Sequence, residues 1–296
     1  MNLNIHTGLG ARFKLQVRKA GTNEVTKESA WSDNIVLDTG LARMSVGMWI
    51  DRCCVGTGNS IPVATQVALD NFLASTTTTT NKVMSLQTVA TPYYKKITQK
   101  WSFGIGVAAG NISEIGLGWG NSNLWDRALV KDTNGSPTTI TVLSDEYLDV
   151  FSELRFYPKA TVEGTFNLLD KMGAIKSTHN YIGVPYLRIS LDGGYSKLGF
   201  SVVDLHSGDM ETSPTSPPGG TLAPSTLQNT YPTATSVQCV ATQDLNRANF
   251  SHRSLSFVIN PLGAMFKMQI DPPITKTDLQ VMTYTIKMSW GRYNVA

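Results

Sequence analysis

Residues 147–158 read YLDVFSELRFYP, and this stretch decides the fold class of the chain. Apolar and polar residues alternate along it, so the apolar side chains fall on one face of an extended strand and the charged ones on the other. The same period of two recurs in RFKLQVR (12–18) and SLSFVI (254–259). The apolar face of the first stretch is formed by Leu148, Val150, Leu154 and Phe156. A mainly β protein is therefore predicted.

Short turn sequences separate several of these strands. Ala20-Gly21-Thr22-Asn23, Asn134-Gly135 and Asp192-Gly193-Gly194 are each typical of tight turns between neighbouring strands. Strands joined by such turns pair in antiparallel fashion, and two sheets with one apolar face each bury these faces against one another. We expect one or more antiparallel β-sandwich domains.

One segment departs from the alternating pattern. IPVATQVALDNFLAS (61–75) places Val63, Val67 and Phe72 near helical spacing, with Pro62 in the first turn. The sequence therefore predicts a single short helix at about 61–75. The threonines at 76–80 that follow are expected to form a loop or an edge strand.

Two positions suggest a division of the chain. A strong strand ends at Pro158, which predicts an N-terminal β-sandwich domain with one helix (1–158) and a second β domain (159–296). Within the second domain, residues 209–236 are rich in Pro, Ser, Thr and Gly and lack a core pattern. We expect this segment to form an extended arm or surface loop, and a neighbouring subunit could order it.

The composition limits the classes of partner. Hydrophobic residues make up 41% of the chain, enough for a substantial core, while charged residues make up 16%, below the roughly 25% of a typical soluble domain. The net charge is +3, and no basic run exceeds Lys95-Lys96, so nucleic-acid binding is not expected. There is neither an apolar run long enough to cross a bilayer nor a secretory leader, so we expect no membrane insertion and folding in the cytoplasm.

The cysteines and histidines do not form a metal-binding or disulfide pattern. Cys53 and Cys54 are adjacent and Cys239 is distant, which favours reduced, buried thiols. The histidines occur singly, without the paired spacing of zinc ligands. We therefore predict no metal and no cofactor. The four histidines are His6, His179, His206 and His252.

Two sequence features superficially suggest enzyme chemistry. VGTGNS (55–60) lies between a strand and the predicted helix, but it matches neither the dinucleotide-binding nor the P-loop pattern, and a simple glycine turn explains it better. A glycosidase would need a pair of carboxylates, but most candidates lie at a turn or on the polar face of a strand, where solvation explains them. No catalytic residue is predicted. The carboxylates considered are Glu114, Asp145, Glu146, Asp149 and Glu153.

Glu114 is the exception, because it lies among apolar residues in NISEIGLGW (111–119). A carboxylate buried without a partner costs several kcal/mol. Arg127, on the next predicted strand, is the nearest suitable partner in the sequence. We interpret Glu114 and Arg127 as a structural pair that fixes strand register, rather than as a catalytic acid and its neighbour.

Aromatic residues offer two interpretations. Trp101, Trp119 and Trp125 are close in sequence and could line a sugar-binding surface, because aromatic faces stack on pyranose rings. Core and subunit-contact roles are the favoured interpretation. Trp119, Trp125 and Tyr231, the last within the predicted arm, are the candidate subunit contacts.

Several stretches have a recognisable local pattern. They are residues 12–44, with Asn34-Ile35-Val36 followed by Gly40-Leu41, VGTGNSIP with the following ALDNFLAS, residues 112–158, and the closing stretch 270–292. Together these stretches resemble virion proteins of tailed bacteriophages, of the tail, baseplate or tail-fibre type. These stretches cover about half of the chain, and residues 159–250 lie outside them.

The resemblance implies a non-enzymatic structural component of the virion tail, assembled in the host cytoplasm. Its partners would be other virion proteins and further copies of itself, and we expect these copies to form a closed ring with cyclic symmetry. One alternative is a receptor-binding, lectin-like tip that binds host-surface glycans. Others are a head decoration or collar protein and a tail-associated glycosidase.

Overall fold

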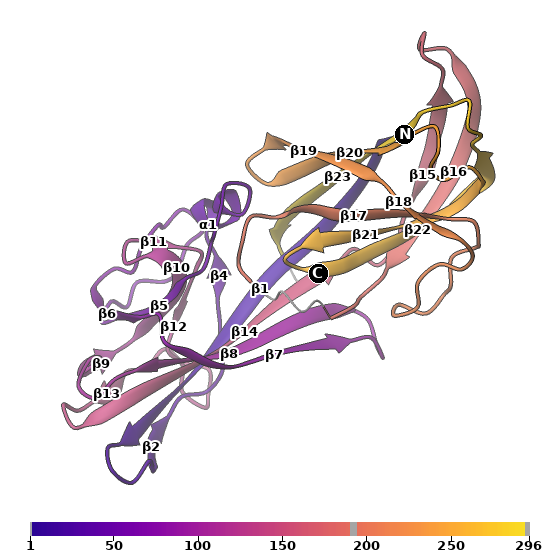
Figure 1. Cartoon of the computed structure of the whole chain (residues 1–296). Coiled ribbons are helices and arrows are strands. Elements are labelled where there is room, and N and C mark those ends of the chain that lie inside the picture. Colours follow the sequence, from indigo (N-terminus) through magenta and orange to yellow (C-terminus); the bar gives the residue numbers. More distant parts are fainter. Residues whose placement is uncertain (1, 190–193, 294–296) are drawn as a thin grey trace.

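The structure is a computed structural model that describes residues 2–189 and 194–293. Strands make up 59% of the chain and helix 2%, which confirms the mainly β class. The paired strands form sheets of nine, six and six strands and one two-stranded sheet. In Figure 1 the molecule is elongated, and the long strands run along its length.

The nine-stranded sheet, here called the central sheet, is built around β1 and β14. β1 pairs with β14 from Thr7↔Pro158 to Lys19↔Glu146, so two of the alternating stretches predicted from the sequence lie side by side. In spatial order its strands are β19 (Thr226–Thr233), β20 (Ser236–Gln243), β23 (Met282–Arg292), β1 (Asn2–Lys19), β14 (Glu146–Pro158), β8 (Tyr94–Phe103) and β7 (Thr79–Gln87), with β2 (Val25–Glu28) and β3 (Ser32–Asp33) also paired to β1.

Two six-stranded sheets accompany the central sheet. The N-terminal sheet contains β4 (Ile35–Val36), β12 (Asp126–Leu129), β10 (Glu114–Gly120), β5 (Arg52–Gly56) and β6 (Phe72–Thr76), with β11 (Asn123–Leu124) beside β10. The C-terminal sheet contains β15 (Val162–Leu169), β16 (Ile175–Pro185), β22 (Gly263–Thr275), β21 (Ser251–Asn260), β17 (Gly199–His206) and β18 (Leu222–Pro224). β9 (Gly110–Ile112) and β13 (Ile140–Val142) form the two-stranded sheet.

The central sheet takes strands from both sides of Pro158, where a domain boundary is predicted. β1 and β14 come from one side of this residue and β20 and β23 from the other, yet all four belong to the central sheet. β1 pairs with β23 in parallel, from Asn2↔Thr285 to Leu9↔Arg292. This parallel pair departs from the predicted antiparallel pattern. β1, at 18 residues, is long enough to pair with β23 near its start and with β3 and β2 further along.

Trp49 joins parts of the core that are distant in sequence. Its ring lies 5.1 Å from that of Trp125, 5.1 Å from that of Tyr195 and 6.5 Å from that of Phe156. Its indole N–H donates to the carbonyl of Ser196 at 2.8 Å. These partners come from the N-terminal sheet, the central sheet and the segment before β17, and Trp49 is fully buried between them.

The helix predicted at 61–75 is wrong. This segment is a loop that ends in β6, and α1 (Asp38–Arg43) is the single α-helix among the described residues. Val63 and Val67, which suggested a buried helical face, are 49% and 48% exposed, so their spacing did not reflect packing. α1 is far too short to span a bilayer, and no other helix of the described chain could do so.

Two of the predicted turns contain a glycine in the left-handed conformation. Gly21 has φ +85° in the β1–β2 turn, and Gly135 has φ +80°, both in the left-handed region that favours glycine. The threonine run continues into β7, which is an edge strand of the central sheet. In the turn expected at 192–194, residues 192 and 193 lie outside the described part of the chain.

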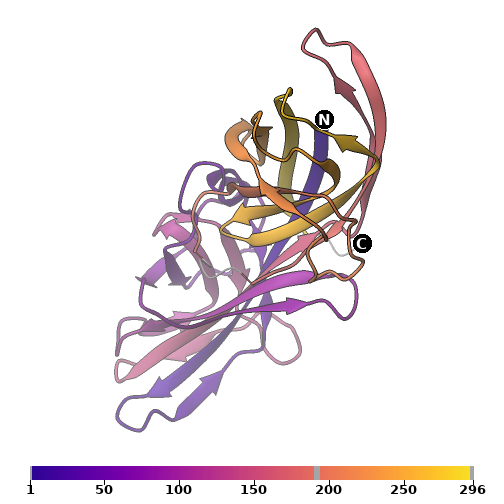
Figure 2. The same cartoon turned by 45° about the vertical axis from the view of Figure 1, so that its right-hand side comes forward.

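The segment predicted as an arm contains β18 and β19, which pair with β17 and β20 of the same chain. The preceding loop is tied down by Lys267, whose buried ammonium group donates to the carbonyls of Ser213 at 2.5 Å and Ser216 at 2.8 Å. Contacts within the chain therefore order much of this segment. The β15–β16 hairpin, by contrast, extends away from the body at the upper right of Figure 1 and at the top of Figure 2.

Candidate functional site

The structure brings Glu114 and Arg127 into direct contact. Arg127 donates to one carboxylate oxygen of Glu114, Oε2, from Nε at 2.9 Å, and its Nη2 lies 2.8 Å from the same atom. Glu114 on β10 is directly opposite Leu129 on β12, so the pair is a diagonal contact between neighbouring strands. Both side chains are fully buried. This contact links the two strands at the register that the structure shows.

The carboxylate of Glu114 also binds backbone N–H groups of the loop at residues 57–71. Oε1 accepts from the N–H of Gly58 at 2.9 Å and of Asn71 at 2.8 Å, and Oε2 accepts from the N–H of Asp70 at 3.0 Å. Hydrogen bonds in which one partner is charged are shorter and stronger than those between neutral groups. Glu114 therefore organises the loop that the sequence suggested was a helix.

The remaining N–H groups of Arg127 bind side chains of the same loop. Nη2 donates to Asp70 at 2.6 Å, and Nη1 donates to Gln66 at 2.8 Å and to Ser60 at 3.3 Å. All five guanidinium donors are thereby used. Burial alone would raise the pKa of Asp70. Hydrogen bonds from Ser60 and the charge of Arg127 outweigh burial, so the pKa of Asp70 is lowered. No donor or acceptor of the Glu114–Arg127 pair is left over for a substrate.

The glycines of VGTGNS are explained by the same cluster. A Cβ atom on Gly56 would lie 2.6 Å from Oε1 of Glu114, and one on Gly58 would lie 2.5 Å from it. The turn thus binds an anion, but this anion is the carboxylate of the chain itself. Ser60, Gln66 and Asp70 were not predicted as members of the cluster. Ser60 was assigned to a simple glycine turn, and the helical interpretation of 61–75 concealed the polar roles of Gln66 and Asp70.

Asp126 is a second buried carboxylate, and the sequence analysis did not single it out. One oxygen accepts from the N–H of Leu117 at 2.7 Å and the other from the amide of Asn34 at 2.6 Å. No basic side chain contacts Asp126 among the hydrogen bonds and ion pairs of the described residues, and burial raises its pKa to about 8 despite the two hydrogen bonds. Asp126 therefore favours its neutral form in the folded protein.

This raised pKa predicts a pH-dependent stability. The pKa of Asp126 is higher in the folded than in the unfolded chain. The stability that the neutral carboxyl group adds to the folded protein is therefore fully present below about pH 4, and it is lost as the pH rises toward about 8. Between pH 6.5 and 8 we expect the free energy of unfolding to fall by up to about 1.4 kcal/mol per pH unit. Urea denaturation across this range measures the slope, and Asp126→Asn should flatten it. An equal slope in both proteins would contradict the assignment.

The carboxylates of β14 are buried beneath basic side chains. Glu153 lies 3.1 Å from Arg12 and 2.5 Å from Arg155, and Asp149 lies 3.2 Å from Arg18. Burial raises the pKa of Glu153, but hydrogen bonds from both arginines outweigh it and lower the pKa. Asp149 and Glu153 were predicted to be solvated, and they are instead 1% and 3% exposed. Arg12 and Arg18 reach these carboxylates from the neighbouring β1, whereas Arg155 lies on β14 itself.

The thiols occupy structural positions. Cys53, Cys54 and Cys239 are free and buried, as predicted. Burial raises the pKa of Cys54 to about 12 and that of Cys239 to about 11, which disfavours the reactive thiolate. Within residues 2–189 and 194–293, no group of three or more His, Cys, Asp or Glu residues could hold a metal ion.

The aromatic candidates have different surroundings. Trp125 is fully buried in its own chain, so its prediction as a subunit contact is wrong: no part of its ring reaches the surface. Trp101 is likewise buried, and its indole donates to Ser152 at 3.0 Å. Trp119 is half-buried beneath the guanidinium of Arg43, and Tyr231 is half-buried and donates to the carbonyl of Leu198 at 2.7 Å.

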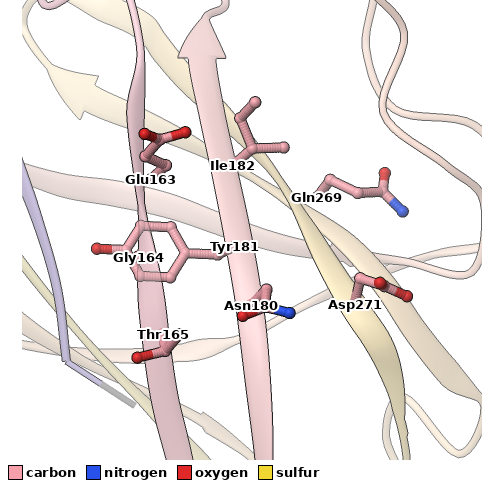
Figure 3. Close-up of a pocket in the computed structure, with 8 residues that line it drawn as sticks. All are labelled: Glu163, Gly164, Thr165, Asn180, Tyr181, Ile182, Gln269 and Asp271. Atoms are coloured by element: carbon pink, nitrogen blue, oxygen red, sulfur yellow. The ribbon is translucent and has the colours of Figure 1, made fainter.

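A shallow hollow of about 470 Å³ lies on β15, β16 and β22 of the C-terminal sheet. Figure 3 shows its side chains, which come from these three neighbouring strands. Strand register places Glu163, Ile182 and Gln269 in one cross-strand row and Thr165, Asn180 and Asp271 in the next. Gly164 and Tyr181 complete the lining.

The hollow is rich in hydrogen-bond acceptors. Glu163 and Asp271 carry carboxylates, Asn180 adds an amide, and none of the lining residues is basic. Such a surface suits a neutral ligand with several hydroxyl groups or a cationic ligand, and it disfavours an anionic one. The residues of the hollow come together only through the pairing of β15, β16 and β22, so no local sequence signal marked it.

Comparison with protein-family models, with curated proteins and with solved structures found no match for this chain. A functional assignment must therefore rest on its own residues and contacts.

Proposed function

We propose that the chain is a non-enzymatic structural component of a tailed phage particle, located in the tail, baseplate or fibre-attachment region, where it assembles as a symmetric oligomer. The local resemblance of residues 12–44 and 112–158 to such proteins supports this proposal. The proposal includes a sandwich architecture, in which the sheets of the chain pack face to face. One large core cluster that draws on the central, N-terminal and C-terminal sheets is consistent with that arrangement.

The observation that carries the proposal is the β15–β16 hairpin. It extends beyond the body of the molecule in both views, and contacts within the chain leave its tip uncovered (Figures 1 and 2). Leu169, Met172 and Ile175 at the tip are 52%, 83% and 62% exposed. A group of exposed apolar side chains on a projecting element is typical of a surface that another chain covers. This is what a self-assembling component requires.

We expect the purified full-length chain to form an oligomer of defined mass in size-exclusion chromatography with multi-angle light scattering. Dilution should dissociate it reversibly, because the contacts are made between separately folded copies. Gold labelling of an affinity tag, followed by electron microscopy of particles from the source phage, would locate the chain and distinguish a tail or baseplate position from a head-decoration or collar position. A chain that stays monomeric at every concentration and is absent from particles contradicts the proposal.

The hollow on the C-terminal sheet favours a second candidate, a receptor-binding tip that holds host-surface glycans. Its acceptor-rich lining matches the vicinal hydroxyl groups of a neutral sugar. Binding on a glycan array that Asn180→Ala abolishes, and that Asn167→Ala on β15 outside the hollow preserves, would support this candidate. In that case the projecting hairpin would present a ligand-binding surface in addition to an assembly surface.

A further inference from the structure

We propose that the chain associates head to tail: the tip of the β15–β16 hairpin in one copy packs on an apolar patch at the opposite end of a second copy. This inference rests on the proposed self-assembly and specifies its contact. The hairpin tip comprises residues 168–176, and the distal patch comprises Leu73, Ile105, Val107 and Leu143.

The hairpin tip is an ordered turn. The side chain of Asp170 accepts from the N–H of Met172 at 2.8 Å and of Ala174 at 3.0 Å, and Gly173 has φ +86°. The backbone N–H of Asp170 also donates to the carbonyl of Ala174 at 2.9 Å. Because the backbone is fixed in this way, the three apolar side chains at the tip are presented at little further entropic cost.

The distal patch is formed by loops that contact one another. Ile105 and Val107 are 61% and 54% exposed, and Leu143 is 51% exposed. The N–H of Gly106, between the first two, donates to the carbonyl of Glu146 at 3.0 Å, which holds this loop beside the one that carries Leu143. Leu73 lies beside Gly110, where an added Cβ atom would be 3.0 Å from its side chain, and Gly110 pairs with Val142, the residue before Leu143.

The two surfaces lie at opposite ends of the molecule. In Figures 1 and 2 the β15–β16 tip is at the top, while β6, β9 and β13, which border the distal patch, are toward the lower left. A contact between two different surfaces is heterologous, and its repetition produces a closed ring or an open stack of copies. Self-assembly along the long axis follows directly from this placement.

The charges of the two surfaces are complementary. Lys171 and Lys176 are exposed within the tip, whereas the carboxylate of Asp170 is engaged in the turn. Asp145 is exposed close to Leu143 at the distal patch. A basic tip would also suit an anionic lipid surface, but a lipid surface would leave the distal patch uncovered. A second copy covers both apolar surfaces at once and pairs their charges, so we assign the tip to a second copy.

Two single variants and their mixture test the contact by light scattering. Met172→Asp removes the tip and Val107→Asp removes the patch, and each should weaken association at least tenfold. Mixed together, they should form a dimer and no larger species, because one variant retains only a patch and the other only a tip. Val89→Asp, at a position 91% exposed and outside both surfaces, should leave the oligomer unchanged.

Other outcomes separate this inference from the proposed function. If the unmodified chain forms an oligomer that both variants preserve, the head-to-tail contact is wrong while self-assembly stands. If Val107→Asp stays oligomeric and Met172→Asp does not, the tips contact each other, and the distal patch is not their partner. Binding of the chain to vesicles of phosphatidylserine that Met172→Asp abolishes, with the oligomer intact, would overturn the inference in favour of a lipid partner. An unmodified chain that is monomeric contradicts both proposals.

Discussion

Arg127→Met should lower the free energy of unfolding by about 3–5 kcal/mol, because it leaves the buried carboxylate of Glu114 without its counter-charge. Methionine fills a similar volume but donates no hydrogen bond, and Arg127 donates to four different side chains. The loss extends to the loop at residues 57–71, which is held to β10 and β12 by these contacts. Urea denaturation of the two proteins, followed by tryptophan fluorescence, measures the difference.

A matched exposed pair provides the control. Lys14 lies 2.6 Å from Glu28, but the two side chains are 26% and 41% exposed, so Lys14→Met should cost no more than about 1 kcal/mol. In the double variant Glu114→Gln/Arg127→Met the loss should be smaller than the sum of the two single losses, because neither charge is then left alone. A loss below about 1 kcal/mol for Arg127→Met would show that the cluster does not hold the loop.

Amide hydrogen exchange resolves the same effect by residue. The N–H groups of Gly58, Asp70 and Asn71 are protected by the carboxylate of Glu114, so all three should exchange faster in Arg127→Met and in Glu114→Gln. Amides of β1 that pair with β14 should keep their protection. If the whole protein loses protection uniformly, the cluster supports global stability and has no local role in the loop.

The Glu114–Arg127 pair was predictable because a buried charge requires a partner, and Arg127 on the next strand was the nearest basic residue to supply it. The loop around the pair was not predictable by the same argument. Val63 and Val67 have the spacing of a helical face, but the segment gains more from giving three backbone N–H groups to Glu114 than from burying two valines. The helical spacing of the valines was outweighed by the hydrogen bonds to Glu114, which lies on a strand more than forty residues from Asn71.

The mainly β class followed from alternation alone, whereas the arrangement of the sheets did not. Period-two patterns identify the buried face of a strand but not the strand beside it. β1 carries such a pattern and also pairs in parallel with β23, close to the other end of the chain. The hollow depends on this kind of long-range placement, because β22 joins β15 and β16 from far along the chain.

Trp49→Ala is expected to be comparably severe, with a loss of about 3–5 kcal/mol in the free energy of unfolding. The indole is fully buried and touches three aromatic rings, so its removal leaves a large cavity between segments that cannot easily close around it. The variant also leaves the carbonyl of Ser196 without its donor. Trp49→Phe should cost less, because a ring still fills part of the space, and exposed Trp31→Ala should cost about 1 kcal/mol or less.

The number of unfolding transitions in these variants shows whether the two halves of the chain unfold together. The backbone N–H of Trp49 donates to the carbonyl of Tyr195 at 2.9 Å, and that of Leu198 donates to the carbonyl of Met44 at 2.9 Å, so the contacts of Trp49 lie beside main-chain bonds between the two halves of the sequence. If β1 and this junction unite the halves into one cooperative unit, the unmodified chain and Trp49→Ala will each unfold in a single calorimetric transition. Two transitions in the unmodified chain would instead favour separate domains at 1–158 and 159–296. Two transitions in Trp49→Ala alone would show that the indole, more than the shared central sheet, couples the halves.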